Sequence, residues 1–308
     1  MTAYLAAGDW GTSAFRLWLL AKDGSVLAER RSDEGLMAAR AAGGFETVLE
    51  RHLSGLGAPA DLPVLLCGMV GARSGWVEAD YLDAPLSLAS IGAHATPVPG
   101  LQRAVRILPG VAQRDPTRPD VMRGEETKLL GLDLADGLVV MPGTHAKWVR
   151  LAGGRLRSFA TFMTGELFAH LSTSARSVLR EALSDGEVAA DDPAFLDGVR
   201  EGVAEPAAIL NRLFQLRAGW LLDRRERPEN LARLSGLLLG LECAGARAVL
   251  GEAAAAPVVV AAGATAGRHA AALEIAGFGA SRCVDAEDAV RAGLLVAART
   301  AFARDRAA

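Results

Sequence analysis

The beginning of the chain alternates between apolar runs and short polar turns. An apolar run, Tyr4–Ala7, ends at Asp9, and a second apolar run begins at Phe15. A glycine and two hydroxyl residues separate them, which predicts strand, tight turn and strand. A third strand is expected over Ser25–Glu29. Further along, the pattern predicts a helix around 44–56 and strands over 62–67 and 104–109. Such alternation of strands and helices predicts an α/β domain.

The pattern restarts after a proline-containing stretch, 114–132, which is a plausible domain junction. We therefore expect domains at 1–115 and 116–308, with the last helix able to pack back on the first domain. The expected elements of the second domain are strands over 137–141, 148–151, 155–161 and 258–262, a largely helical region over 165–250, and helices over 267–276 and from 287. Leu231, Leu234, Leu238 and Leu241 recur at helical spacing, which is typical of core packing.

Two turns in the chain resemble each other. Gly11-Thr12 follows the first apolar run, and Gly143-Thr144 lies between the strands expected at 137–141 and 148–151. Backbone amides and hydroxyls suit a phosphate chain, and Asp9 beside them could hold Mg²⁺ through water. Arg16 either answers negative charge or pairs with a carboxylate such as Glu34. The alternative is an ordinary hairpin with a polar turn, but the repetition favours a two-domain clamp on a nucleotide.

Composition narrows the class of protein. The chain has 308 residues, a net charge of −3 and no run of Lys or Arg, so a nucleic-acid partner is not expected. No apolar run is long enough to cross a bilayer, and no membrane partner is expected. Three widely spaced cysteines are interpreted as reduced core thiols of a cytoplasmic protein. The histidines are scattered and are assigned no metal.

Six segments together resemble the 2-dehydro-3-deoxygalactonokinase family of the sugar-kinase, actin and heat-shock-protein superfamily. They are GDWGTSAFRLW (8–18), GMVGARSGWVEADYLDAPL (68–86), PDVMRGEETKLLG (119–131), MPGTHAKWV (141–149), FATFMTGELFAHL (159–171) and LSGLLLGLE (234–242). The resemblance implies an actin-like ATPase fold, with two ribonuclease-H-like α/β domains around a nucleotide cleft. It also implies ATP as the phosphate donor and a loop on the adenosine side at Ala261–Thr265.

The resemblance and the chemistry of the turns together define an expected cofactor site. Its residues are Gly11, Thr12, Ser13, Arg16, Gly143, Thr144, His145, Lys147 and Gly263, with Asp9 in the Mg²⁺ environment. His145 is expected to fix the second turn, and Lys147 to reach phosphate. Thr164 is expected to cap a helix whose first turn holds Glu166, a structural role.

A kinase also needs a base and a means of binding its substrate. Glu125, or its neighbour Glu126, is expected to take the hydroxyl proton, although two acids at a solvated helix start would also suit the helix dipole. Arg73 or Arg123 is expected to bind the substrate carboxylate, and either could instead form a salt bridge. Further substrate contacts are expected from Trp76, Glu78 and Tyr81.

The expected activity follows from the resemblance. It is ATP-dependent phosphorylation of 2-dehydro-3-deoxy-D-galactonate at its terminal hydroxyl, giving the 6-phosphate and ADP. The alternatives are a kinase for another sugar or sugar acid, and a non-catalytic nucleotide or sugar-acid sensor on the same fold. The sequence leaves the oligomeric state open, and a homodimer is possible.

Overall fold

The chain forms two compact units. The computed structural model describes residues 2–223, 225–251 and 256–303. Unit 1 combines the chain up to Ala135 with Gly153–Arg157 and the segment from Ala286 onward, and unit 2 combines Asp136–Ala152 with Ser158–Asp285. The observed boundary thus lies after the predicted one at 115/116, because residues 116–135 belong to unit 1.

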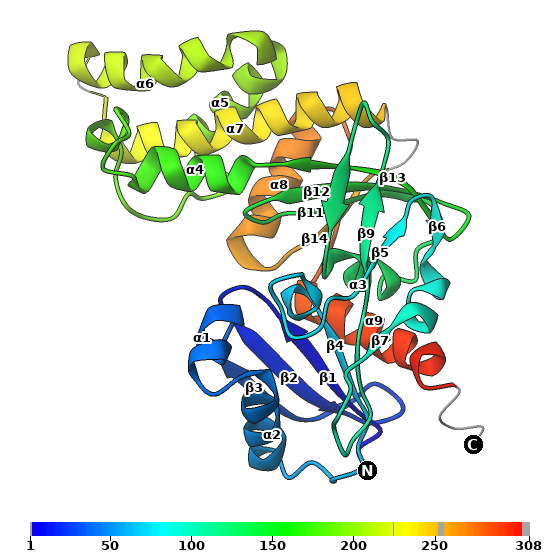
Figure 1. Ribbon diagram of the computed structural model, residues 1–308. Coiled ribbons are helices and arrows are strands. Elements are labelled where there is room, and N and C mark those ends of the chain that lie inside the picture. Colours follow the sequence, from blue (N-terminus) through cyan, green and yellow to red (C-terminus); the bar gives the residue numbers. More distant parts are fainter. Residues whose placement is uncertain (1, 224, 252–255, 304–308) are drawn as a thin grey trace. The chain divides into compact units, whose positions relative to one another are not determined.

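The main sheet of unit 1 has the strand order β3-β2-β1-β4-β8-β7. Its strands are β1 (Leu5–Trp10), β2 (Phe15–Leu20), β3 (Val26–Ser32), β4 (Val64–Cys67), β7 (Thr96–Pro97) and β8 (Val105–Ile107). β1 pairs antiparallel with β2 and parallel with β4, so the opening hairpin lies beside the predicted buried strand (Figure 1). Helices α1 (Leu36–Ala41) and α2 (Phe45–Gly55) add Leu36, Leu49 and Leu53 to the core of this sheet.

Unit 1 also contains elements that the hydrophobic pattern did not predict. A second sheet has the order β10-β9-β5, made of β5 (Tyr81–Asp83), β9 (Gly110–Gln113) and β10 (Asp120–Met122). The two-residue strand β6 (Leu86–Ser87) pairs with the start of β13 (Arg155–Phe162). Helices α3 (Glu125–Leu130) and α9 (Ala286–Ala301) touch through their backbones, since a Cβ on Gly293 would lie 1.8 Å from the carbonyl oxygen of Thr127. The stretch predicted as a junction therefore supplies β10 and α3 to unit 1.

Unit 2 contains the second main sheet and most of the helices. The sheet runs β15-β14-β11-β12-β13, with β11 (Gly137–Met141), β12 (Ala146–Ala152), β14 (Val258–Val260) and β15 (Arg282–Val284). Its helices are α4 (Thr164–Thr173), α5 (Pro193–Ala204), α6 (Ile209–Asp223), α7 (Arg227–Leu250) and α8 (Gly263–Ile275). Leu231, Leu234 and Leu238 of α7 are buried in the core of unit 2, as predicted, whereas Leu241 is only half-buried. α7 approaches α5 so closely that a Cβ on Gly202 would lie 3.0 Å from Gly240 Cα.

The two main sheets share one plan. In unit 1, β1 pairs antiparallel with β2 and parallel with β4, and β4 pairs parallel with β8. In unit 2, β11 likewise pairs antiparallel with β12 and parallel with β14, and β14 pairs parallel with β15. In unit 1, β3 lies next to β2 on the side away from β1, and in unit 2, β13 lies next to β12 on the side away from β11. The prediction of two ribonuclease-H-like α/β units is therefore confirmed.

Two further expectations concern the cysteines and the membrane. Cys67 and Cys243 are buried free thiols, but Cys283 is exposed, so the expectation that all three are core residues is wrong for Cys283. The reason is its place on β15, which is the outermost strand of its sheet. Within the described residues, none of the helices combines the length and apolar character needed to cross a bilayer.

Candidate active site

Turn one, defined here as Gly11–Ala14, closes the hairpin of β1 and β2. The amide of Gly11 donates to the carbonyl of Ala14 at 2.9 Å. A Cβ on Gly35 would lie 2.2 Å from the carbonyl oxygen of Thr12, so the start of α1 packs directly on this turn. The side chains of Thr12 and Ser13 are exposed. The predicted phosphate-binding groups of turn one are thus held by a rigid backbone and face outward.

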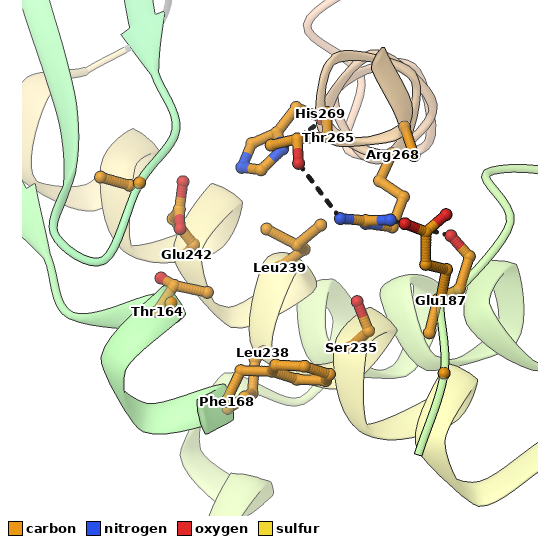
Figure 2. A pocket seen from close by; sticks show the side chains of 16 residues that line it. Thr164, Phe168, Glu187, Ser235, Leu238, Leu239, Glu242, Thr265, Arg268 and His269 are labelled. Atoms are coloured by element: carbon orange, nitrogen blue, oxygen red, sulfur yellow. Dashed lines mark hydrogen bonds between the residues drawn. The ribbon is translucent and has the colours of Figure 1, made fainter. Parts of the chain in front are cut away.

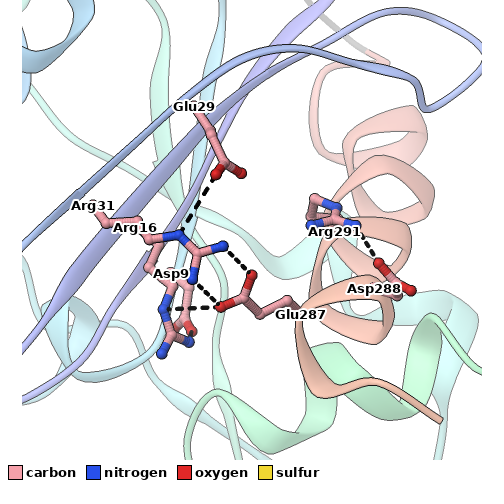
Figure 3. Close-up of polar contacts among 7 residues, drawn as sticks. All are labelled: Asp9, Arg16, Glu29, Arg31, Glu287, Asp288 and Arg291. Atoms are coloured by element: carbon pink, nitrogen blue, oxygen red, sulfur yellow. Dashed lines mark hydrogen bonds and ion pairs between the residues drawn. The ribbon is translucent and has the colours of Figure 1, made fainter. Parts of the chain in front are cut away.

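Asp9 lies at the end of β1, opposite Arg16 on β2. Arg16 Nη1 is 3.8 Å from the Asp9 carboxylate and Arg16 Nε is 3.5 Å from Glu287 on α9, which Arg31 also grips (Figure 3). The suggested partner of Arg16, Glu34, is therefore not its partner, because Glu34 pairs with Arg51 and His52 instead. Burial raises the pKa of Asp9, while the positive charges of Lys128 and Arg16 oppose the shift. Lys128 was not among the predicted site residues.

Two glycines bring the start of α3 close to Asp9. Gly68 and Gly124 have φ values of +90° and +104°, which favour glycine. A Cβ on Gly68 would lie 3.2 Å from Asp9 Oδ1, and one on Gly124 would lie 3.3 Å from Gly68 Cα. The RGEE stretch therefore meets the carboxyl ends of β1 and β4. That the RGEE stretch lies close to Asp9 could not be inferred from their positions along the chain.

The two predicted base candidates differ in their surroundings. Glu126 is only 1% exposed, and it accepts hydrogen bonds from the Gly124 amide at 2.7 Å and the Thr127 hydroxyl at 2.9 Å. Burial, followed by the charge of Glu125, raises the pKa of Glu126 to about 7. Glu125 is half-buried and accepts from the amide of Arg123 at 3.0 Å. The pair is therefore not a fully solvated helix start, and of the two side chains Glu125 is the more accessible to a ligand.

The predicted substrate residues fall into two groups. Arg123 stacks 4.3 Å above the Tyr81 ring and donates from Nη2 to the Ala79 carbonyl at 2.8 Å, while its Nε and Nη1 are buried and unpaired within the described chain. Trp76 packs on Trp10 and Phe45 and belongs partly to the core. Arg73 and Glu78 are exposed on the loop between these groups. The structure thus joins Arg123 with Tyr81.

Turn two, defined here as Pro142–His145, closes the hairpin of β11 and β12. Gly143, Thr144 and His145 are exposed. The carbonyl of Thr144 accepts from the amide of Glu166 at 3.0 Å, and Glu166 Oε2 lies 2.5 Å from His145 Nε2. His145 was predicted to make a hydrogen bond that fixes this turn, and its partner is Glu166.

Two expectations next to turn two need revision. Lys147 is 6% exposed and donates from Nζ to the Thr161 hydroxyl on β13 at 2.7 Å, so its packing does not favour direct contact with phosphate. α4 begins at Thr164 itself with Met163 in the capping position, and no side chain caps it. Thr164 is therefore not the cap, and its hydroxyl lies close enough to lower the pKa of Glu242 on α7.

A cavity of about 420 Å³ opens beside turn two, entirely within unit 2 (Figure 2). Its apolar walls are Phe168, Leu238 and Leu239, and its polar rim includes Gly143, Thr164, Ser235, Thr265, Arg268 and His269. Arg268 is fixed by donating to the Val188 carbonyl at 2.9 Å. Gly263, with a φ of +57° and nothing within 4 Å of where a Cβ would be, leaves the start of α8 open next to this cavity. A mostly apolar cavity with a few convergent polar groups is typical of small-molecule sites.

Two buried titratable groups in this cavity were missed in the sequence. Glu242, 2% exposed, accepts from Trp148 Nε1 at 2.8 Å, and burial raises its pKa to about 7. Burial lowers the pKa of His269 to about 4, and its Nδ1 lies 2.8 Å from the Thr265 carbonyl. His269 is thus neutral with the proton on Nδ1. An acid within the leucine-rich LSGLLLGLE segment was the one available signal for Glu242.

The residues that could hold a metal are few. Among the described residues, no three His, Cys, Asp or Glu side chains come together in an arrangement that could hold a metal ion. Asp9 lies in no such group. A site without a full cage of protein ligands still suits Mg²⁺, which keeps most of its water and takes one or two protein carboxylates alongside substrate phosphates.

Comparison with known proteins identifies the family. The family description "2-keto-3-deoxy-galactonokinase" matches residues 9–297. The chain is 51% identical to a Rhizobium meliloti (strain 1021) protein named probable 2-dehydro-3-deoxygalactonokinase, over 96% of this chain and 97% of that one. It is 37% identical to the 2-dehydro-3-deoxygalactonokinase of Escherichia coli K12, over 80% and 82% of the two chains. A crystal structure of a Sinorhizobium meliloti protein described under the same enzyme name superimposes with a TM-score of 0.91 at 50% identity, covering 96% of this chain and 98% of that one. The chain therefore belongs to the 2-keto-3-deoxy-galactonokinase family.

Proposed function

We propose that this protein transfers the terminal phosphoryl group of ATP to the 6-hydroxyl of 2-dehydro-3-deoxy-D-galactonate. The products are 2-dehydro-3-deoxy-6-phosphogalactonate and ADP. Family membership supports the choice of substrate. The observation that carries the chemistry is the approach of α3 to the end of β1: Gly124, the residue before Glu125, packs on Gly68, which lies beside Asp9 in unit 1. A base candidate beside a phosphate-type turn is the arrangement that phosphoryl transfer to an alcohol requires.

ATP is assigned to turn two and the adjoining cavity of unit 2. The exposed backbone of Gly143 and Thr144 supports contacts with phosphate, since amides suit its oxygens. The apolar walls of the cavity suit a nucleoside, and Gly263 leaves the start of α8 open to it. The prediction that both turns close on one phosphate chain stays a prediction.

Glu125 is assigned the role of general base. Its carboxylate accepts the proton of the 6-hydroxyl as the oxygen forms its bond to the γ-phosphorus and the bond to the bridging oxygen of ADP breaks. Glu125 suits this role better than Glu126, because Glu126 uses its oxygens on Gly124 and Thr127. Glu126 instead supports the backbone from which Glu125 projects. Much of the rate gain then comes from this positioning.

Mg²⁺ is assigned to the neighbourhood of Asp9. When bound, the ion neutralises charge on the β- and γ-phosphates. Asp9 would hold it through water, and the positive charges of Lys128 and Arg16 oppose the effect of burial, which raises the pKa of this carboxyl. Thr12 and Ser13 extend outward from the same turn and are available to phosphate oxygens.

Arg73 is assigned to the substrate carboxylate, and Arg123 to bracing the loop. Arg73 is exposed, and its planar guanidinium can bind a carboxylate through two parallel hydrogen bonds. Arg123 is committed to the Tyr81 ring and the Ala79 carbonyl, and its remaining N–H groups are covered by protein. Arg73→Ala should therefore raise the KM for the sugar acid with little change in thermal stability. Arg123→Ala should lower the melting temperature. If instead Arg123→Ala raises the KM and Arg73→Ala lowers the melting temperature, Arg123 binds the carboxylate and Arg73 has the structural role.

The decisive experiment is a coupled ADP-release assay with Mg-ATP. The substrates are 2-dehydro-3-deoxy-D-galactonate, its gluconate epimer and several neutral hexoses. Turnover confined to the galactonate would support the proposal, and equal use of both epimers would widen it to other sugar acids. If all substrates are inert while ATP binds, the protein acts as a sensor. The predicted cytoplasmic location and possible homodimer stay predictions.

A further inference from the structure

The first turn of α4 is built onto turn two at three points. A Cβ on Gly165 would lie 2.3 Å from the carbonyl oxygen of Gly143, so no other residue allows this approach without a shift of backbone. The amide of Glu166 donates to the Thr144 carbonyl at 3.0 Å. The Glu166 side chain then returns to His145, with 2.5 Å between Oε2 and Nε2. Glu166 thus contacts two consecutive residues of the turn, Thr144 through its backbone amide and His145 through its side chain.

The Glu166 carboxylate is shared with a second histidine. His170, one helical turn further along α4, has its Nε2 3.8 Å from Glu166 Oε1. The side chain of Glu166 is 32% exposed, whereas those of His145 and His170 are 50% and 72% exposed. His145 is therefore the better-held partner. Because its Nε2 is engaged by Glu166, Nδ1 is the ring nitrogen that is left to contact a ligand at the turn.

We infer that Glu166 is a positioning residue that orients His145, so that Nδ1 of His145 contacts the phosphate chain of the nucleotide bound at turn two. This deepens the proposed function and rests on it. A phosphate oxygen accepts hydrogen bonds, so the contact requires a proton on Nδ1. With Nε2 engaged by the Glu166 carboxylate, both ring nitrogens would then act as donors.

The charges around His145 can be named from each neighbouring element. Glu166 and His170 lie on α4, Lys147 lies on β12 with its ammonium on Thr161, and Glu242 of α7 holds Trp148 of β12. Of these, Glu166 alone makes direct contact with the His145 ring among the described residues. The contact between His145 and the nucleotide should therefore depend on the Glu166 carboxylate, and its loss should raise the KM for ATP.

The test compares Glu166→Gln, His145→Asn and the double variant. Glu166→Gln keeps the size of the side chain but removes the carboxylate that orients the His145 ring, and misplacing a catalytic contact costs about 100-fold. We expect kcat/KM for ATP to fall about 10- to 100-fold, with the KM for the sugar acid unchanged. The double variant should be no worse than His145→Asn alone, because the two residues act as one unit.

Matched controls separate positioning from folding. His170→Gln removes the more distant histidine and should change kcat/KM for ATP by no more than a few-fold. Glu274→Gln removes an exposed carboxylate of α8 and should change neither kcat/KM for ATP nor the melting temperature. Additive losses in the double variant, or an unchanged KM for ATP in Glu166→Gln, would overturn the inference.

A binding measurement keeps this inference separate from the proposed function. Calorimetry with a non-hydrolysable ATP analogue needs no sugar acid and no turnover. The analogue should bind more weakly to Glu166→Gln and His145→Asn, even if every sugar acid proves inert. Unchanged affinity in both variants would refute the contact. Inert sugar acids with weakened affinity would refute the proposed substrate and leave the contact in place.

Discussion

Turn one and turn two have the same construction but different chemistry. In each, a glycine at the start of a helix packs on the turn. A Cβ on Gly35 would lie 2.2 Å from the carbonyl oxygen of Thr12, and a Cβ on Gly165 would lie 2.3 Å from the carbonyl oxygen of Gly143. In each, the next residue of the helix donates its amide to a carbonyl of the turn, Leu36 to Gly11 at 3.3 Å and Glu166 to Thr144 at 3.0 Å. The repeated scaffold therefore extends beyond the hairpins to the helices that support them.

The difference lies in the side chains that the shared scaffold carries. After the glycine, α1 continues with Leu36, which is buried in the core of unit 1, whereas α4 continues with Glu166, whose carboxylate reaches His145. Turn one follows an aspartate within a network of Arg16, Arg31 and Glu287, whereas turn two has Pro142 after its strand. We infer that turn one serves the metal, the transferred phosphate and the acceptor, and that turn two serves the nucleotide.

Among the tests of this division between the turns, Glu125→Gln in unit 1 should have the largest effect. Loss of a general base should lower kcat by about 10²- to 10⁴-fold. Affinity for a non-hydrolysable ATP analogue should stay within a few-fold of wild type, because turn two is untouched. Glu126→Gln is the matched neighbour, and its smaller effect on kcat would agree with the supporting role. If Glu126→Gln is the more damaging at an intact fold, the two roles are reversed.

The glycines that support the turns offer the next test. Gly35→Ala and Gly165→Ala each place a methyl group against backbone, and overpacking of this kind costs about 1–3 kcal/mol. Both variants should melt at lower temperature. Gly165→Ala should also raise the KM for ATP more than Gly35→Ala does, if turn two holds the nucleotide.

Gly267→Ala provides the control for these variants. This helical glycine of α8 has only an ordinary contact, with Ala190 Cβ 3.4 Å from the added methyl. The substitution should leave activity unchanged and raise stability by up to about 1 kcal/mol, as for glycine in a helix interior. Equal effects of Gly35→Ala and Gly165→Ala on the KM for ATP would contradict the division between the turns.

Each unit also contains one buried carboxyl with a pKa of about 7, Glu126 in unit 1 and Glu242 in unit 2. An unfolded glutamate ionises near 4.5, so between pH 4.5 and 7 the unfolded chain releases a proton that the folded chain keeps. The free energy of unfolding should therefore fall as pH rises through this window, by at most about 3 kcal/mol per group.

Urea unfolding between pH 4.5 and 8 measures this slope. Glu242→Gln should remove its own share of the slope, and so should Glu126→Gln. The exposed Glu274→Gln should keep the wild-type slope. A slope unaffected by either buried substitution would mean that neither carboxyl has a raised pKa in the folded protein.

The smallest effect is expected from the ion pairs beside turn one. Arg31 holds Glu287 with two contacts of 2.8 and 2.7 Å, but its side chain is 54% exposed. Arg31→Ala should lower the free energy of unfolding by about 0.2–1 kcal/mol, and less at high salt. Thermal melts at low and high salt would measure this. A loss well above 1 kcal/mol that persists at high salt would mean that the network is more than a surface pair.

Local patterns predicted the strands and helices that carry regular periodicity. The hairpin of β1 and β2, the strand β11 and the helices α2 and α9 form close to their predicted ranges, because side-chain alternation and helical spacing are local signals. The short strands β5, β9 and β10 were not predicted, since three or four residues carry too little pattern. The domain boundary was placed too early because residues 116–135 join unit 1 through contacts with distant segments: β9, the partner of β10, pairs with β5, and α3 packs on α9.

The amino-acid sequence by itself determined the two glycine-threonine turns, the paired acids Glu125 and Glu126, and through its motifs the family. Only the tertiary structure decided which of these groups are buried, paired or accessible. It placed Lys147 on Thr161, buried Glu126, braced Arg123 on Tyr81 and joined Glu166 to His145. The physical reason is that a turn or a helix start is encoded by neighbouring residues, whereas burial and charge pairing arise between segments that meet only when the chain folds.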